Sequence, residues 1–152
     1  DSSTESDVVT VIETNLDNMP ADIQAYVMER LFDQGALDVF VTPIVMKKGR
    51  SAAKLTILAN PDEVDTLSDF LFAETPTLGV RIYETRRRKL VREARSVETP
   101  WGHVNVKISF LQGRLRDASP EYEDCRAIAV QSGVPLRKII DCAREAMLKQ
   151  LA

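Results

Sequence analysis

Residues that usually hold transition metals or form covalent cross-links are scarce in this chain. Its 152 residues include two cysteines, Cys125 and Cys142, and one histidine, His103. Two cysteines do not make a disulfide framework, and they have no partners at the spacing of a zinc site. A single histidine in a predicted hairpin is not a metal site either, and a turn or surface role is expected for it. We therefore expect a protein of the reducing cytoplasm.

Several other patterns are missing as well, and each absence excludes a class of protein. No apolar run approaches the length of a membrane span, and no signal-peptide pattern opens the chain. The sequence contains no Walker loop, no dinucleotide-binding fingerprint and no Ser/His/Asp constellation. The net charge is −3, which does not suggest a nucleic-acid coat protein. We expect neither a membrane nor a nucleic acid among its partners.

The charged residues that are present are unevenly distributed. Residues 1–40 hold nine acidic side chains and one basic side chain, whereas residues 81–95 hold seven basic and two acidic ones. An acidic and a basic face in one small fold can hold a metal ion and a phosphate side by side. The alternative is an ordinary charged surface.

Hydrophobic periodicity and turn residues predict an α+β fold that begins with a ferredoxin-like unit. Residues 1–7 form a polar tail, which we expect to be a disordered linker left where an upstream domain was cut away. The predicted elements that follow are a strand at 8–12, a helix opening at 17–20 and ending at Gly35, strands at 36–46 and 52–59, a helix from 60 to about 75, and a strand at 77–90. This βαββαβ order is that of the split βαβ unit, so we assign residues 8–90 to a ferredoxin-like domain.

A second unit is predicted over residues 91–152. Residues 95–98 and 103–110 read as a β-hairpin, because apolar and polar side chains alternate along the second segment. A helix is expected to start at 119–121 and to end at Gly133, and a last helix is expected to start at Pro135. The prediction is therefore a β-hairpin followed by a pair of helices.

The two helices also resemble a DNA-binding helix-turn-helix over residues 120–150. Arg137, Lys138 and Arg144 would lie on the second helix, so a regulatory DNA-binding module is an alternative function. Against it, three acids stand at the start of the first helix and the whole chain is acidic, whereas phosphate-contacting modules are usually basic. Two helices joined at a glycine also form a common structural corner.

The stretch between the second and third predicted strands is basic. Lys47, Lys48 and Arg50 surround Gly49 in a short loop, where cations and turn N–H groups form a good site for a triphosphate. A solvated hairpin tip that keeps the sheet edge soluble is the alternative. The run 86–89 is longer, but successive strand residues face opposite sides, so it cannot present all four charges to one ligand.

Two carboxylates stand where the first strand meets the first helix. Ligands gather at such junctions in α/β sheets, and hard cations take oxygen ligands. Glu13 and Asp17 are therefore candidate ligands for Mg²⁺ or Mn²⁺ carrying a nucleotide. A helix-capping role for Asp17 and a surface role for Glu13 are the alternatives.

Six stretches taken together resemble one known family. They are Glu13–Met19, Tyr26–Leu31, Gly35–Val39 leading to Thr42–Lys48, Glu74–Arg81, Glu98–Gly102 and Pro120–Cys125. These stretches are similar, in order, to the C-terminal domain of the nickel-insertion proteins that make the nickel-pincer nucleotide cofactor (the LarC family). The likeness covers nearly the whole chain beyond the acidic tail. Asn18 departs from the pattern, because the family often has a second acid at this place.

The resemblance implies a CTP-dependent nickel chelatase of the lyase class. Such a protein inserts nickel into pyridinium-3,5-bisthiocarboxylic acid mononucleotide, the precursor of the lactate racemase cofactor, and it assembles as a homo-oligomer. The family's C-terminal region is linked to CTP with Mg²⁺ or Mn²⁺. By resemblance, Lys47, Lys48, Arg50 and Arg81 become expected nucleotide ligands, and Glu13 and Asp17 become expected metal ligands. Without the family's N-terminal domain, this fragment is expected to bind nucleotide but not to complete nickel insertion.

Overall fold

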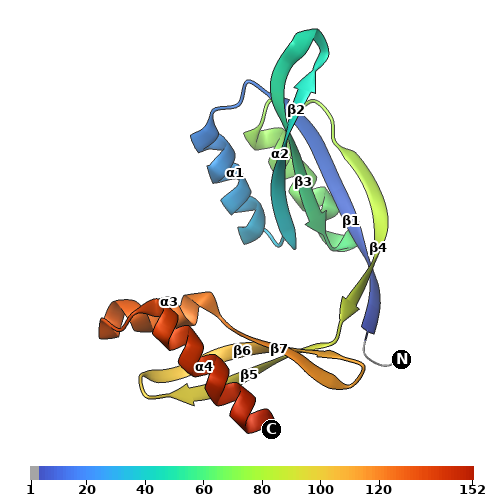
Figure 1. Ribbon diagram of the computed structural model, residues 1–152. Helices are drawn as coiled ribbons and strands as arrows, with labels where there is room; N and C mark the ends of the chain where they lie inside the picture. Colours follow the sequence, from blue (N-terminus) through green and yellow to red (C-terminus); the bar gives the residue numbers. More distant parts are fainter. Residues whose placement is uncertain (1–3) are drawn as a thin grey trace. The chain divides into compact units, whose positions relative to one another are not determined.

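The computed structural model describes residues 4–152, which form two compact units (Figure 1). The first unit comprises residues 6–87, and the second comprises residues 88–152 together with Thr4 and Glu5. This division lies close to the boundary expected from the sequence, between residues 90 and 91. Part of the expected N-terminal tail, residues 4–7, belongs to a strand, and residues 1–3 lie outside the described residues.

The first unit has the expected ferredoxin-like βαββαβ order. Its elements are β1 (Thr4–Asp17), α1 (Ala21–Asp33), β2 (Asp38–Met46), the short turn η1 (Lys47–Gly49), β3 (Arg50–Ala59), η2 (Pro61–Glu63), α2 (Val64–Glu74) and β4 (Arg81–Leu90), whose last residues enter the second unit. The strands are arranged β2-β3-β1-β4. Strand β3 runs antiparallel to both of its neighbours, which is the topology of the split βαβ unit.

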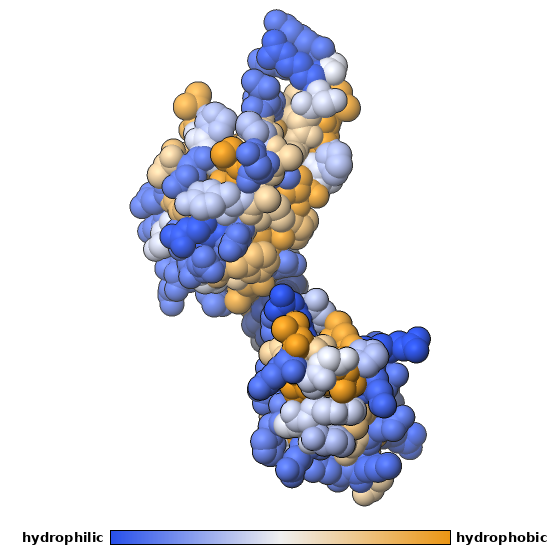
Figure 2. Space-filling model, turned by 90° about the vertical axis from the view of Figure 1, so that its left-hand side faces the viewer, coloured by the Kyte–Doolittle hydropathy of each residue, from blue (hydrophilic) through white to orange (hydrophobic). Residues whose placement is uncertain are grey.

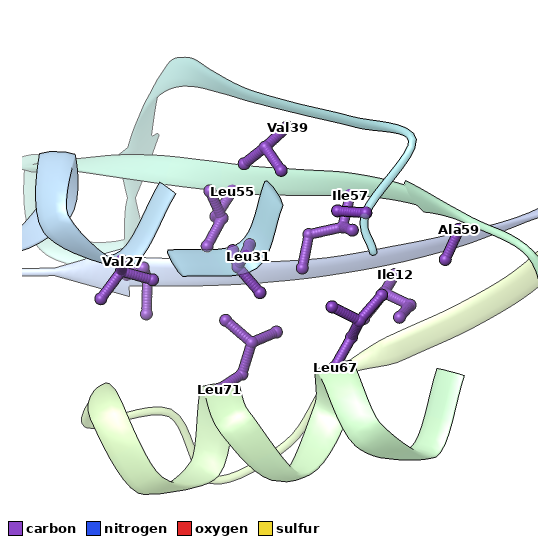
Figure 3. Close-up of a cluster of buried hydrophobic side chains, with 11 residues drawn as sticks. Ile12, Val27, Leu31, Val39, Leu55, Ile57, Ala59, Leu67 and Leu71 are labelled. Atoms are coloured by element: carbon purple, nitrogen blue, oxygen red, sulfur yellow. The ribbon is translucent and has the colours of Figure 1, made fainter. Parts of the chain in front are cut away.

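Alternation along the strands separates a buried face of this sheet from an open one. On β1, Ile12 and Leu16 are buried against helices α1 and α2, whereas Glu13, Asn15 and Asp17 point to the opposite face. Figure 3 shows the buried side chains of α2 pointing at those of the strands. The buried core of this unit consists of Ile12, Leu16, Val27, Leu31, Ala36, Val39, Leu55, Ile57, Ala59, Leu67 and Leu71. The face opposite the helices therefore carries polar side chains towards the end of β1, whereas Val9 and Val11 on the same side of the strand are buried.

The second unit contains three strands rather than the expected hairpin. Its elements are β5 (Arg92–Thr99), β6 (Gly102–Leu111), β7 (Arg114–Pro120), α3 (Tyr122–Ser132) and α4 (Leu136–Leu151), and the sheet order is β5-β6-β7. Strand β7 carries three charged residues and buries only Ala118, so it shows little of the alternation that identifies a strand. Pro120, expected to open the third helix, instead ends β7, and that helix begins at Tyr122.

Helices α3 and α4 pack on this second sheet around a core of their own. Cys125, Ile139, Ala143 and Met147 are fully buried with the apolar side chains of β5, β6 and β7. The turn between the helices passes through Gly133 at a φ of 73°. Arg144, one of the three cations of the helix-turn-helix alternative, donates from Nε to the backbone oxygen of Ala118 at 3.0 Å. Among the described residues, no helix is long and apolar enough to cross a membrane.

Candidate nucleotide site

The basic loop predicted from the sequence forms the tip of the β2–β3 hairpin. Met46 pairs with Arg50, and the three residues between them make the turn η1. Lys47, Lys48 and Arg50 are all exposed. Figure 2 shows hydrophilic residues gathered over this end of the hairpin, at the top of the view. The tip thus presents three cationic side chains to solvent.

The backbone of this turn has an unusual conformation. Lys48 has a φ of 64° and a ψ of 22°, and Gly49 follows with a φ of 71°. Glycine adopts positive φ without penalty, but a residue with a side chain loses roughly 1–2 kcal/mol in the left-handed region. Strained non-glycine residues concentrate at ligand-binding sites, where the fold holds them in place. The same pair of left-handed residues occurs at Gln112 and Gly113 in another hairpin, so the tight turn by itself accounts for the conformation of Lys48.

A surface hollow of about 530 Å³ lies next to the hairpin tip, and its lining is polar. It is lined by Asp17 and Asn18, at the end of β1, and by Arg50 and Ser51, at the start of β3. Asp17 lies near Arg50 and Ser51 because it pairs with Ala52, the next residue of β3, in the β1–β3 ladder. The structure therefore brings together one predicted metal ligand, Asp17, and one predicted phosphate ligand, Arg50.

The other two predicted site residues meet further along the same open face. Arg81 donates from Nε to Glu13 Oε1 at 2.8 Å and from Nη2 to Asn15 Oδ1 at 2.8 Å. The Tyr83 hydroxyl donates to Glu13 Oε2 at 3.4 Å, and Lys54 Nζ lies 4.0 Å from that oxygen. The hydrogen bond from Arg81 is the main cause that lowers the pKa of Glu13, with partial burial opposing it and Lys54 and Tyr83 reinforcing it.

Glu13 and Asp17 share a face of β1 but have different neighbours. They are four residues apart in a strand, which separates their Cα atoms by about 13 Å. In this structure the Glu13 carboxylate is held by Arg81 of β4, and Asp17 lines the hollow beside Arg50. Over residues 4–152 there is no cluster of three or more His, Cys, Asp or Glu side chains that could hold a metal ion. Of the two predicted metal ligands, Asp17 therefore lies at the hollow and Glu13 at Arg81.

The basic run at the end of β4 is used within the fold. Arg87 donates from Nε and Nη2 to the two carboxylate oxygens of Asp7, at 3.0 and 2.8 Å. These hydrogen bonds are the main cause that raises the pKa of Arg87. Arg88 donates to the hydroxyl of Thr4 at 3.3 Å. Arg87 is therefore a cross-strand tie between β1 and β4.

Several residues of this face were not singled out from the sequence. Asn15, Lys54 and Tyr83 surround Glu13 and Arg81 only because β1, β3 and β4 are neighbours in the sheet. Alternation from Glu13 does place Asn15 and Asp17 on one face, which is a signal present in the sequence. Lys54 lies near Glu13 because the β1–β3 register places it opposite Asn15.

Comparison with known proteins assigns the chain to a family. Residues 1–140 match the family model described as "Nickel insertion protein". A putative nickel insertion protein of Dictyoglomus thermophilum is 44% identical over 130 residues, which cover 86% of this chain and 33% of that protein. The pyridinium-3,5-bisthiocarboxylic acid mononucleotide nickel insertion protein of Acetivibrio thermocellus is 42% identical over 142 residues, covering 93% of this chain and 35% of that protein.

Solved structures agree with this assignment. The apo form of LarC2, the C-terminal domain of a cyclometallase involved in the synthesis of the NPN cofactor of lactate racemase, has a TM-score of 0.83 and 40% identity, covering 94% of this chain and 99% of that one. A Methanopyrus kandleri protein, with a TM-score of 0.67, 20% identity and coverage of 95% and 91%, shares the fold. The chain spans about a third of the length of its curated relatives, at 33% and 35% of the two named above. By its family match, its relatives and its fold, the chain belongs to the nickel insertion protein family.

Proposed function

We propose that this chain is the CTP-binding domain of a CTP-dependent nickel chelatase that inserts nickel into the nickel-pincer nucleotide cofactor. One observation carries the proposal: three cations at the β2–β3 tip adjoin a hollow in which Arg50 and Asp17 lie together. Cations beside a carboxylate match a nucleoside triphosphate bound with a divalent metal. Membership of the nickel insertion family and the structural match to a cyclometallase domain support it.

The residues have distinct roles in this proposal. Lys47, Lys48 and Arg50 bind the triphosphate, and Asp17 contributes a ligand to the Mg²⁺ or Mn²⁺ that accompanies it. The hollow offers the oxygen-rich groups that these hard cations prefer, since Asn18 and Ser51 also line it. When bound, the metal ion neutralises phosphate charge. Nickel and the pincer nucleotide precursor are substrates of the complete lyase, so this chain alone binds nucleotide without completing insertion.

Titration calorimetry with CTP, UTP and ATP, each in Mg²⁺ and in Mn²⁺, tests the proposal. We expect CTP to bind with the highest affinity, and we expect removal of the divalent metal by a chelator to weaken binding. Equal affinities for the three nucleotides would sink the cytosine-specific form of the proposal. Duplex DNA is titrated in parallel: sub-micromolar binding with a steep salt dependence would favour the helix-turn-helix alternative instead.

We also propose that the chain assembles as a homo-oligomer in the cytoplasm. Support comes from large apolar side chains exposed on the first unit, among them Phe40 at 42% and Val45 at 75% exposure. Phe40 stands opposite Thr56 on the open face of the sheet. Apolar side chains on an uncovered sheet face favour burial against another surface.

A further inference from the structure

We propose that a separate hollow in the second unit binds a pyridinium mononucleotide through its aromatic ring, its ribose and its phosphate. The hollow has a volume of about 480 Å³ and lies between the β5–β6 turn and the first half of helix α4. Its lining includes Trp101, Arg137, Lys138, Asp141, Cys142 and Glu145. The inference rests on the proposed function only for the class of ligand, because a pyridinium mononucleotide is the substrate proposed for the complete lyase.

The spacing of residues along α4 separates a core face from the face that lines the hollow. Lys138, Cys142 and Glu145 follow one another at intervals of four and three residues, so they lie along one side of the helix and border the hollow. A different stripe of the same helix is fully buried in the core of the second unit, namely Ile139, Ala143 and Met147. Core packing therefore fixes the direction in which the hollow-lining side chains leave the helix.

Trp101 supplies an aromatic wall that the β5–β6 turn holds in place. Its backbone N–H donates to the Thr99 hydroxyl at 3.2 Å, and that hydroxyl donates to the Gly102 backbone oxygen at 2.7 Å. The indole is partly buried against the apolar core of the second unit and also borders the hollow. Indole faces stack on aromatic rings and attract cations. A pyridinium ring is both aromatic and cationic, so it suits this wall better than a neutral base does.

The charges of the hollow are separated along α4. Arg137 and Lys138 stand in the first turn, whereas Asp141 and Glu145 stand about one and two turns further on. Over residues 4–152, none of these four side chains forms an ion pair, so they are available to a ligand. Two adjacent cations suit the phosphate of a mononucleotide, and a carboxylate accepts hydrogen bonds from ribose hydroxyls. The hollow thus offers a partner for each part of the ligand.

This hollow is distinct from the proposed triphosphate site. Its lining residues all belong to the second unit, whereas the β2–β3 tip and the hollow beside Arg50 belong to the first. A volume of about 480 Å³ lies within the range of sites that hold small molecules and cofactors. An enzyme that uses a nucleoside triphosphate on a second nucleotide needs two sites, and each unit provides one.

A purely structural role for Trp101, as a cover over the core, is the competing explanation. It does not account for the unpaired cations of α4 at the same hollow. The helix also contains a matched control for Lys138, because Lys149 in the last turn is exposed and lies outside the hollow. The two lysines are about 16 Å apart along the helix axis. Removing either one changes the net charge of the protein equally.

The test titrates the protein with nicotinic acid mononucleotide, a pyridinium ring with a carboxylate, attached to ribose 5′-phosphate. Trp101 is the only tryptophan in the chain, so its fluorescence reports on a ring that stacks in the hollow. We expect saturable quenching. Lys138→Gln should weaken binding roughly tenfold, because it removes a charge-assisted hydrogen bond to phosphate, and Lys149→Gln should leave binding unchanged. Circular dichroism establishes that each variant is folded.

Cys142 provides a second measurement, which needs no substitution. Cys125 is fully buried, whereas Cys142 is partly exposed and lines the hollow. A thiol-alkylating reagent should therefore label Cys142, and saturating nicotinic acid mononucleotide should slow this labelling severalfold. Mass spectrometry of the labelled peptide gives the rate. An unchanged rate at saturating ligand would show that the ligand lies elsewhere.

Two other results overturn the inference. Absence of saturable quenching, or equal weakening in Lys138→Gln and Lys149→Gln, removes the site from this hollow. Uridine monophosphate is titrated in parallel, and equal binding of this neutral-base nucleotide contradicts selection of a pyridinium ring. No step involves CTP, so these results leave the triphosphate site intact. If the pyridinium ligand binds as expected and CTP does not bind, the proposed function fails while this assignment stands.

Discussion

At the scale of single residues, Lys48 affects the stability of the fold through its backbone and, as we propose, nucleotide binding through its side chain. Its left-handed conformation costs free energy of folding, whereas its side chain stands where the triphosphate is proposed to bind. The β6–β7 hairpin offers an independent example of the same backbone, since Gln112 has a φ of 52° and is followed by Gly113 at 73°. Stability and binding can therefore be changed in opposite directions at one position.

We expect Lys48→Asn to keep or raise stability and to weaken CTP binding by roughly tenfold. Asparagine tolerates positive φ better than lysine, which recovers up to about 1 kcal/mol, and loss of the cation removes a charge-assisted hydrogen bond worth about 1.5–3 kcal/mol. Thermal unfolding and calorimetry measure the two effects. Gln112→Asn is the matched control, because it relieves the same strain and should leave binding unchanged. Normal CTP binding by Lys48→Asn would remove this residue from the site.

At the scale of elements, the β2–β3 tip and strand β4 are two basic segments that could bind the triphosphate. Their surroundings in the structure differ. The β2–β3 tip presents its cations to solvent beside Asp17, whereas β4 distributes its cations over both faces of a strand. Arg87 is hydrogen-bonded through two nitrogens to Asp7. Arg87 would have to break these hydrogen bonds before it could bind a phosphate group, so we expect its contribution to triphosphate binding to be small.

Alanine substitutions distinguish the two segments. Arg50→Ala should weaken CTP binding tenfold or more at one fixed salt concentration, with little effect on unfolding. Arg87→Ala should leave binding nearly unchanged and should lower stability by up to about 1 kcal/mol, because the pair it breaks is only partly shielded from solvent. Calorimetry and urea unfolding provide the readouts. Loss of binding in Arg87→Ala together with normal binding in Arg50→Ala would show that the site lies on β4.

At the scale of the whole molecule, the proposed homo-oligomer can be tested without a ligand. Light scattering at micromolar concentration should give a mass well above the 17.0 kDa of the single chain. Phe40→Glu places a charge on the open sheet face and should lower that mass. Thr66→Glu serves as the control, because Thr66 is an exposed polar residue of α2, which packs on the other face of the sheet. A monomeric mass with and without CTP would contradict the proposal.

The sequence alone determined the family and the order of elements in the first unit. Alternation marked the strands, Pro61 and its neighbours marked the start of a helical segment, and Gly133 marked the end of another, because each of these signals acts over a few residues. Strand β7 was not predicted, because it has charged residues and only one buried position, Ala118, and therefore no clear alternation. The sequence also predicted that Lys47, Lys48 and Arg50 form a basic hairpin tip, because a short loop with a glycine between two strands is a local signal.

Only the tertiary structure decided which of these residues meet. Glu13 and Arg81 are separated by 68 positions, and they make contact because β1 and β4 are adjacent in the sheet. Asp17 lies beside Arg50 rather than beside Glu13, because the register of β1 against β3 places it at the hairpin. Strand order and register depend on how α1 and α2 bury the apolar face of the sheet, which is a property of the whole core. Local patterns fix which face of a strand is buried, but the neighbours of a polar side chain are set by packing between distant segments.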